Sequence, residues 1–299
     1  MFLAVIIVSY NPGDRLKATL GSLLSQEERD FRVIVKDAGS TDGSEQAARK
    51  ELADPRVTYV SQSDRGIYDG MNQALEILFS QAQRGEAELP EWIYFLNCGD
   101  LLHDERVLSR VREAVGYTVQ ESLSEAAGAR EPASEGSVID GDNERIRIMY
   151  GDIIEMRTGQ RAAANPRMDA FACFRNVPCH QACFYHASLL FRERFETRWR
   201  VRADYEHFLR CVLSQKVRTK ALGFVICDYE GGGFSESREG SKRSAEEHRE
   251  ITARYFTRSQ RIRYRMYLIL TLQPLRAFLA GNRITAGLYQ GIRSRLLKR

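Results

Sequence analysis

The sequence predicts an α/β fold built on a mostly parallel β-sheet flanked by helices. Apolar runs rich in Val, Ile, Phe and Tyr alternate with segments of helical periodicity through the first hundred residues, which is the pattern of repeated βαβ units. The runs are continuously apolar, as expected for strands covered on both faces. A chain of 299 residues with 43% hydrophobic residues can bury the core of such a domain.

Four predicted strands alternate with helices in this region. The first helix begins at Asp14 and ends near Gln26, because leucines recur there at helical spacing. A second helix is expected over residues 44–53, and a third continues to about Gln83. The predicted strands cover residues 2–9, 31–35, 57–61 and 92–96.

Beyond the fourth strand the sequence changes in character. Residues 118–144 are rich in Glu, Ala, Ser and Gly, so we expect a flexible insertion there. A further strand is expected over residues 146–150. We therefore predict one domain over residues 1–238, which includes the insertion, and a basic helical tail over residues 239–299.

The tail differs from the rest of the chain in charge. Residues 251–299 contain eleven Lys and Arg and no acidic residue, whereas residues 1–250 contain 33 basic and 40 acidic residues. Tyr, Leu, Ile and Phe lie among the basic residues, which is typical of a helix on an anionic membrane surface. The apolar run 266–275 is too short to span a bilayer. A helical pair that packs on the domain with a solvated basic face is the alternative.

The composition favours a cytoplasmic protein. Six cysteines show no pairing pattern, which suits a reducing compartment. The apolar residues 1–8 have no basic segment and continue directly into SYNPGD, so we interpret them as a strand and not as a signal peptide. Together with the tail, this predicts a peripheral location at the inner face of the plasma membrane. No motif of a nucleic-acid-binding fold accompanies the tail, and we expect no nucleic acid partner.

Polar segments follow each of the four strands. The carboxyl ends of parallel strands share one edge of the sheet, where α/β sheets bind nucleotides. Each segment by itself is also typical of a turn. The stretch DAGSTDGS lacks the spacings of the dinucleotide-binding and P-loop motifs, which argues against a dinucleotide-dependent oxidoreductase. The four segments are residues 9–11, 37–44, 64–72 and 97–100.

Several side chains in these segments suit a nucleotide ligand. Asp37 directly follows the second strand, and its carboxylate can accept hydrogen bonds from a nucleobase or a ribose. Arg65 suits the oxygens of a diphosphate, and Asp64 beside it suits a ribose. Asn72 is expected near the start of a helix at the ligand edge. The first segment adds Ser9, Tyr10 and Asn11.

Five motifs together resemble a known family. VIIVSYN, KDAGSTDGS, DRGIYDGMNQAL, FLNCGD and VRADYEHFLR occur in the order and approximate spacing of family 2 inverting glycosyltransferases with the GT-A fold. The resemblance extends over about residues 1–235. GIYDGMNQAL, LNCGD and CHQACFY together resemble the sequences of bacterial enzymes of exopolysaccharide and colanic-acid-type assembly. It implies transfer of a sugar from a UDP- or GDP-linked donor to a hydroxyl of a glycan or a polyprenyl-diphosphate-linked acceptor.

The resemblance also implies a divalent cation, Mg²⁺ or Mn²⁺, on the diphosphate of the sugar donor. Such cations prefer oxygen ligands and offset the charge of the leaving group. The family carries a D-x-D motif, and the matching residues here are NCGD. Asp100 is therefore the candidate metal ligand, and we expect weak metal binding without the sugar donor. Asn97 is expected to contact a ribose or a metal-bound water.

The general base implied by the resemblance lies in RADYEHFLR. A carboxylate can remove the proton of the acceptor hydroxyl, and Asp204 is the candidate. Glu206 is the reserve candidate, although two residues along a helix it points to a different face. An aspartate at a helix start is also stabilised by the helix dipole without any catalytic role.

Three further candidates for the sugar-donor site depend on the resemblance. Asp152 resembles a family position near the transferred sugar, and His180 and Gln181 can orient the sugar or a phosphate oxygen. A turn aspartate and a structural histidine are the alternatives. Zinc binding by Cys179, His180, Cys183 and His186 is disfavoured, because these four ligands lie within eight residues and no second knuckle accompanies them.

A non-catalytic module is the alternative function. In this reading the α/β domain binds a nucleotide sugar without turnover, and the tail binds a membrane or another partner. The single carboxylate of NCGD supports this alternative.

Overall fold

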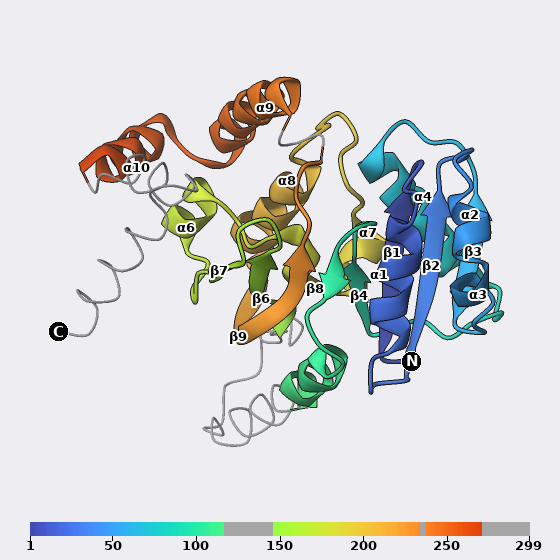
Figure 1. Cartoon of the computed structure of the whole chain (residues 1–299). Coiled ribbons are helices and arrows are strands. Elements are labelled where there is room, and N and C mark those ends of the chain that lie inside the picture. The colour runs from blue at the N-terminus through green and yellow to red at the C-terminus, as the bar shows by residue number, and fades with distance from the viewer. Residues whose placement is uncertain (117–145, 234–236, 271–299) are drawn as a thin grey trace, which may run out of the picture. The chain divides into compact units, whose positions relative to one another are not determined.

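The computed structural model describes residues 1–116, 146–233 and 237–270 (Figure 1). The chain divides into two compact units, Met1–Glu247 and His248–Arg299. The predicted insertion over 118–144 and the tail beyond residue 270 lie outside the described residues.

The first unit begins with a parallel sheet. β1 (Leu3–Ser9) lies between β2 (Phe31–Asp37) and β4 (Trp92–Phe95), and β3 (Val57–Ser61) pairs with β2. These four strands match the predicted strands. Residues 3–7 of β1 are all buried, because helices cover both faces of the sheet. The connecting helices are α1 (Arg15–Leu24), α2 (Ser44–Ala47), α3 (Arg49–Leu52) and α4 (Ile67–Gln83), followed by a helix described over 107–116.

The two faces of this sheet have separate helix contacts. Leu16 and Leu20 of α1 join one core cluster with Leu3 and Val5 of β1. α4 also packs on β1 and β2. Since alternate side chains of a strand point to opposite faces, residues such as Ile6 are left to cover the other face.

The second half of the sheet is largely antiparallel. β8 (Cys183–His186) pairs antiparallel with both β4 and β6 (Ile146–Glu155), and β6 pairs parallel with β9 (Arg218–Tyr229). β5 (Leu101–Leu102) and β7 (Gln160–Ala162) pair antiparallel with β9 and β6. The remaining helices of this region are α6 (Ala170–Arg175), the 3₁₀ turn His180–Ala182, α7 (Ala187–Arg192), and α8 (Ala203–Leu209), which continues into a π-helical turn over Arg210–Ser214.

One predicted strand end is wrong. The strand expected to end at residue 150 continues to Glu155, because β6 keeps pairing with β9 through irregularities on either side of Asp152. The hairpin to β7 also extends it. Asp152 therefore lies inside a strand and not in the turn after it.

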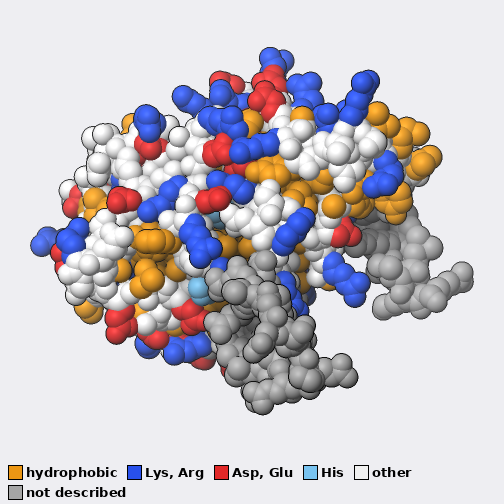
Figure 2. Space-filling model, turned by 180° about the vertical axis from the view of Figure 1, so that it is seen from behind, with side chains coloured by type: hydrophobic (Ala, Val, Ile, Leu, Met, Phe, Trp, Pro, Cys, Tyr) orange, Lys and Arg blue, Asp and Glu red, His pale blue; other side chains and the backbone are white. Residues whose placement is uncertain are grey.

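The region of the predicted tail begins with two helices, α9 (Arg238–Tyr255) and α10 (Arg258–Leu270). Among the described residues, no helix is long and apolar enough to cross a membrane. α10 exposes large apolar side chains, namely Ile262, Met266, Tyr267, Ile269 and Leu270. On the face of the molecule in Figure 2, Lys and Arg side chains are spread among acidic and apolar ones, so charge alone does not single out a binding surface there.

Candidate active site at the carboxyl edge of the sheet

The four polar segments meet at one edge of the sheet. Ser9 at the end of β1 is level with Asp37 at the end of β2, and Asp37 is level with Ser61 at the end of β3. β4 runs in the same direction beside β1, so residues 97–100 follow it at the same edge. The parallel topology brings the predicted segments together.

Asp37 organises the loop that follows β2. Its carboxylate accepts hydrogen bonds from the Ser9 hydroxyl at 2.9 Å and from the backbone N–H groups of Gly39 and Ser40 at 2.9 and 2.6 Å. Burial alone would raise the pKa of Asp37, but the hydrogen bonds from Ser40, Ser9 and Gly39 outweigh it and lower the pKa. The side chain is 1% exposed, so its oxygens are used within the protein.

Asn11 connects the first polar segment to the second. Its backbone is in the left-handed region, with φ of 46°, which asparagine tolerates better than most residues. Its Oδ1 accepts the N–H of Thr41 at 2.9 Å, and its own N–H donates to the Ser40 hydroxyl at 2.7 Å. The neighbouring Tyr10 is 67% exposed and is free to meet a ligand ring.

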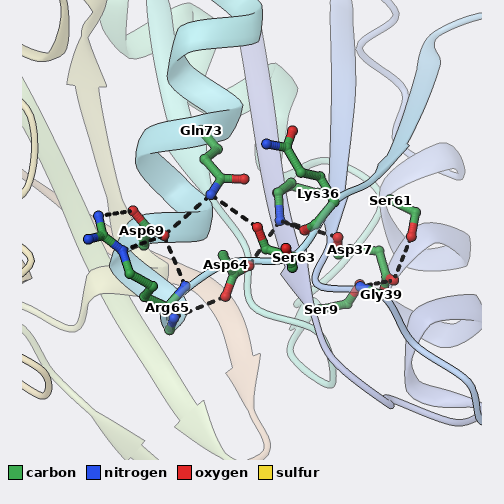
Figure 3. Close-up of polar contacts among 12 residues, drawn as sticks. Ser9, Lys36, Asp37, Gly39, Ser61, Ser63, Asp64, Arg65, Asp69 and Gln73 are labelled. Atoms are coloured by element: carbon green, nitrogen blue, oxygen red, sulfur yellow. Dashed lines mark hydrogen bonds and ion pairs between the residues drawn. The ribbon is translucent and has the colours of Figure 1, made fainter.

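A buried lysine holds the third segment in place (Figure 3). Lys36 is fully buried, and its Nζ donates to the carbonyl oxygen of Gln62 at 2.5 Å and to Asp64 Oδ2 at 2.9 Å. Asp64 Oδ1 accepts the N–H of Gly66 at 3.0 Å. Both oxygens of Asp64 thus have protein partners. Sequence reasoning missed Lys36, although a lysine inside the apolar run FRVIVKD is an indication of a buried ion pair.

Arg65 and Asn72 differ in how far they reach the surface. The side chain of Arg65 is 83% exposed and pairs with Asp69 at 3.2 Å, so its guanidinium lies within reach of an anionic ligand. Asn72 lies within α4, where its amide accepts the N–H of Phe195 at 3.1 Å and donates to the Phe195 carbonyl at 2.9 Å. Asn72 therefore ties α4 to the segment at residue 195.

The segment FLNCGD forms a tight turn after β4. The N–H of Asp100 donates to the Asn97 carbonyl, and Gly99 has φ of 108°. Thr19 of α1 fixes the turn, because its hydroxyl oxygen accepts the N–H of Gly99 and donates to the Asp100 carbonyl. A Cβ at Gly99 would lie 2.3 Å from Glu230 Oε2. The turn thus favours glycine for its backbone, and a Cβ there would also displace the flexible end of the Glu230 side chain.

Asp100 is buried at this turn with few partners. Its side chain is 4% exposed, and Oδ1 accepts the N–H of Glu230 at 2.9 Å. Burial, with a smaller effect of the Glu230 charge, raises the pKa of Asp100 to about 7. No basic side chain among the described residues forms an ion pair with it. Sequence reasoning missed Glu230, which follows β9 and pairs with Arg15 at 2.9 Å.

The oxygen atoms at the turn fit a hard divalent cation. Asn97 Oδ1 is buried and accepts no hydrogen bond from the described residues, and it lies on the same turn as the Asp100 carboxylate. Within the described ranges, no group of three or more His, Cys, Asp or Glu could hold a metal ion. The protein thus offers too few ligands for a closed site, and a cation that also binds the diphosphate fits better.

Asp204 and Glu206 point to different surroundings, as their spacing predicts. Asp204, in the first turn of α8, is partly exposed, and its Oδ1 accepts the Tyr68 hydroxyl at 2.8 Å. Glu206 is fully buried, with Arg210 at 3.5 Å. Asp204 is the carboxylate that a ligand can reach.

His180 is a buried side chain close enough to Asp204 to feel its charge. Its side chain is 7% exposed, and neither ring nitrogen has a partner among the described residues. Its ring stacks on Phe95 at 5.0 Å between centroids. Burial lowers the pKa of His180, and the charge of Asp204 opposes this. An unpaired imidazole at this depth is suited to a polar ligand.

The two remaining predicted residues, Gln181 and Asp152, have protein partners. Gln181 Oε1 accepts the Cys179 thiol at 3.0 Å, and the Cys183 thiol donates to the Cys179 carbonyl at 3.2 Å. Asp152, which is 5% exposed, binds Arg161 Nε at 2.7 Å and the N–H of Ala164 at 2.8 Å. These contacts stabilise the fold around the site.

Sequence comparisons relate the chain to named proteins. The family model "Glycosyl transferase family 2" matches residues 4–118. A PGL/p-HBAD biosynthesis glycosyltransferase of Mycobacterium tuberculosis is 27% identical over 239 residues, which cover 78% of this chain and 79% of that protein. An N-acetylglucosaminyl-diphospho-decaprenol L-rhamnosyltransferase of M. tuberculosis is 32% identical over 96 residues, which cover 32% of this chain and 31% of that protein.

Solved structures share the fold. The mannosyltransferase PcManGT from Pyrobaculum calidifontis, in complex with GDP-Man and Mn²⁺, has a TM-score of 0.56 at 18% identity, over 99% of this chain and 80% of that one. TarS of S. aureus has a TM-score of 0.52 at 17% identity, over 77% of this chain. The match spans 60% of that TarS chain. The predicted GT-A fold is thereby confirmed.

Proposed function

We propose that this chain is a glycosyltransferase similar to family 2 enzymes. It transfers a sugar with inversion from a nucleotide-diphosphate donor to a hydroxyl of a glycan or lipid-linked acceptor. The reaction belongs to cell-surface polysaccharide synthesis. The observation that carries this proposal is the environment of the Asp204 carboxylate. Its carboxylate is partly exposed and is held by a neutral hydroxyl, which leaves it able to accept a proton.

The sugar donor is proposed to bind along the carboxyl edge of the sheet. The loops that Asp37 and Asn11 hold together would receive the nucleoside, and Arg65 would meet the diphosphate. Ser9 and Asp64 would contribute by fixing the loops at this edge, since their polar groups already bind the protein. Asn72 would contribute by holding α4 to the segment at residue 195. PcManGT was solved with GDP-Man and TarS with UDP, and a UDP- or GDP-linked sugar suits the proposed site.

Asp100 and Asn97 would hold Mg²⁺ or Mn²⁺ against the diphosphate. The cation, when bound, would offset the charge of the leaving group. Asp204 would take the proton of the acceptor hydroxyl as its oxygen attacks the anomeric carbon opposite the leaving group. His180, and Gln181 beside it, would orient the sugar, because the His180 ring nitrogens lack protein partners among the described residues. Asp152 would support this region through Arg161.

A polyprenyl-diphosphate-linked glycan is the proposed acceptor. One relative is named as an enzyme that acts on a decaprenol-linked sugar, and the apolar side chains exposed on α10 suit a lipid surface. The basic tail would hold this cytoplasmic enzyme at the inner face of the plasma membrane. The alternative function is a nucleotide-sugar-binding module without catalysis. The observation that supports this alternative is the single carboxylate of NCGD.

The test compares wild type, Asp204→Asn and a control, Asp104→Asn, whose carboxylate pairs with Arg110. A thermal-shift panel of nucleotide sugars with and without Mn²⁺ first identifies the sugar donor. We expect Asp204→Asn to lower donor turnover by about a hundred-fold or more, with sugar-donor affinity retained and Asp104→Asn unchanged. Binding of the sugar donor by all three proteins without turnover, across a broad acceptor panel, would instead support the module.

A further inference from the structure

Tyr68 lies in the first turn of α4, and its hydroxyl reaches two acceptors. The phenol oxygen is 2.8 Å from Asp204 Oδ1 and 2.8 Å from the carbonyl oxygen of Val201. A phenol carries one proton, so it donates to one of these acceptors at a time. The side chain is 8% exposed, so the phenol proton goes to one of these two protein groups.

The protonation state of Asp204 decides which acceptor receives this proton. When Asp204 is ionised, the phenol donates to the carboxylate, because a charge-assisted hydrogen bond is the stronger one. When Asp204 is protonated, its own O–H donates to the phenol oxygen, and the phenol proton turns to the Val201 carbonyl. Both distances are 2.8 Å, an ordinary hydrogen-bond length, so either arrangement fits these positions of the oxygen atoms.

The phenol itself keeps its proton in both arrangements. Burial raises the pKa of Tyr68 well above its ordinary value, and the negative charge of Asp204 raises it further. Tyr68 therefore redirects a hydrogen bond and does not act as an acid or a base.

A buried carboxylate fixes the position of the Val201 carbonyl. Glu247 is 5% exposed, and it accepts the backbone N–H groups of Arg200, Val201 and Arg202 at 2.8, 3.0 and 2.9 Å. These three bonds hold the segment that leads into α8. The second acceptor of Tyr68 is thus held in place by a buried side chain.

We propose that Tyr68 is a positioning residue for Asp204, which turns its hydroxyl from the carboxylate to the Val201 carbonyl when Asp204 takes up a proton. The inference rests on the proposed role of Asp204 as base. As the acceptor oxygen bonds to the anomeric carbon, the bond from that carbon to the diphosphate breaks, and its electron pair leaves with the nucleoside diphosphate. The acceptor proton moves to Asp204. Because Tyr68 then turns to Val201, the protonated carboxyl is not left without a buried partner.

Other titratable groups lie close enough to Asp204 to feel its charge. They come from the segment before β8 and from β8 itself, and the charge of Asp204 acts on each of them. Burial lowers the pKa of His180 and raises the pKa values of Cys179, Cys183 and Tyr185. The charge of Glu247 also acts on Tyr68, so the Asp204→Asn variant is needed to assign a response of Tyr68 to Asp204.

The test is a ¹³C NMR titration of the full chain with tyrosine labelled at Cζ, from neutral pH into acid for as long as the protein stays folded. The Tyr68 resonance is assigned by its loss in Tyr68→Phe. We expect this resonance to shift in a single step, which disappears in Asp204→Asn because an amide does not titrate. Tyr205 is the internal control, because its hydroxyl donates to the carbonyl of Cys173 at 2.8 Å and its resonance should not move. A Tyr68 resonance that stays constant through the titration, or that still steps in Asp204→Asn, overturns the proposal.

This result does not depend on turnover. Failure of the proposed function can therefore be distinguished from failure of the proposed role of Tyr68. Where turnover is measured, we expect Tyr68→Phe to lower kcat by about ten- to a hundred-fold with the KM for the sugar donor unchanged. Tyr205→Phe, which also removes one buried hydroxyl, should retain wild-type kcat. An equal loss of kcat in both variants would mean that Tyr68 only supports the fold.

Discussion

At the scale of single residues, the acidic side chains of the site fall into two groups. Asp37, Asp64 and Asp152 accept hydrogen bonds to both carboxylate oxygens from protein groups. Among the described residues, Asp100 and Asp204 each accept one hydrogen bond, from the Glu230 N–H and from the Tyr68 hydroxyl. Since a carboxylate that is already fully bonded gains little from a ligand, chemistry is expected at Asp100 and Asp204.

Asp100 gives the first test of this distinction. We expect Asp100→Ala to raise the Mn²⁺ concentration needed for stabilisation by the sugar donor by about ten-fold or more, because a carboxylate ligand is lost. Without ligands the variant should remain folded, since burial disfavours the ionised form of Asp100 and the carboxylate stabilises the fold little. Thermal shift with and without Mn²⁺ measures both effects.

Asp100→Asn is the size-matched control, because it can still accept the N–H of Glu230. It should lose Mn²⁺ dependence while keeping the turn. Wild-type Mn²⁺ dependence in both variants would rule out Asp100 as the metal ligand.

At the scale of elements, the strands were predictable because buried strands appear in the sequence as continuous apolar runs. β3 has the predicted bounds, and β1, β2 and β4 differ from theirs by one or two residues. The bounds of β6 were not predictable, because its last residues are held by pairing with β7 and β9, which are distant in sequence or lack a strong strand pattern. The helix predicted over residues 44–53 is divided into α2 and α3 at Ala48.

The candidate site shows the same limit. The order of strand ends predicted which loops meet, since a parallel sheet requires it. Tyr68, Lys36 and Glu230 were missed, because their importance depends on partners that are far away in the sequence. Tyr68 and Asp204, for example, are separated by 136 residues, and their hydrogen bond has no local signal.

Asn72 tests whether α4 contacts the sugar donor or only packs. Its amide makes two hydrogen bonds to the Phe195 backbone, so we expect Asn72→Ala to lower the free energy of unfolding by about 1–3 kcal/mol. Nucleotide affinity should change little. Denaturant unfolding and nucleotide titration measure the two quantities, with the exposed Gln83→Ala on the same helix as control. Lost nucleotide affinity with unchanged stability would favour the predicted contact with the sugar donor.

At the scale of the whole molecule, the charge contrast between the two parts of the chain predicts a division of labour. The first 250 residues carry an excess of acidic groups, and the remainder carries eleven basic and no acidic residues. An acidic surface is repelled by anionic lipid, so membrane attachment of the full chain would depend on the basic segment.

Deleting residues 251–299 should therefore abolish sedimentation with anionic vesicles while nucleotide binding is retained. Binding of the full chain to the vesicles should weaken as salt is added, because screening reduces the attraction between exposed charges. A full-length variant with Arg261, Arg263 and Arg265 changed to Glu controls for misfolding of the deletion, and it should lose vesicle binding with its helical content intact. Ile269 and Leu270 are also exposed on α10 and can contact lipid without any charge. Neutral vesicles should therefore still bind the full chain, but only weakly. Vesicle binding that survives both the charge reversal and the deletion would assign membrane attachment to the first unit.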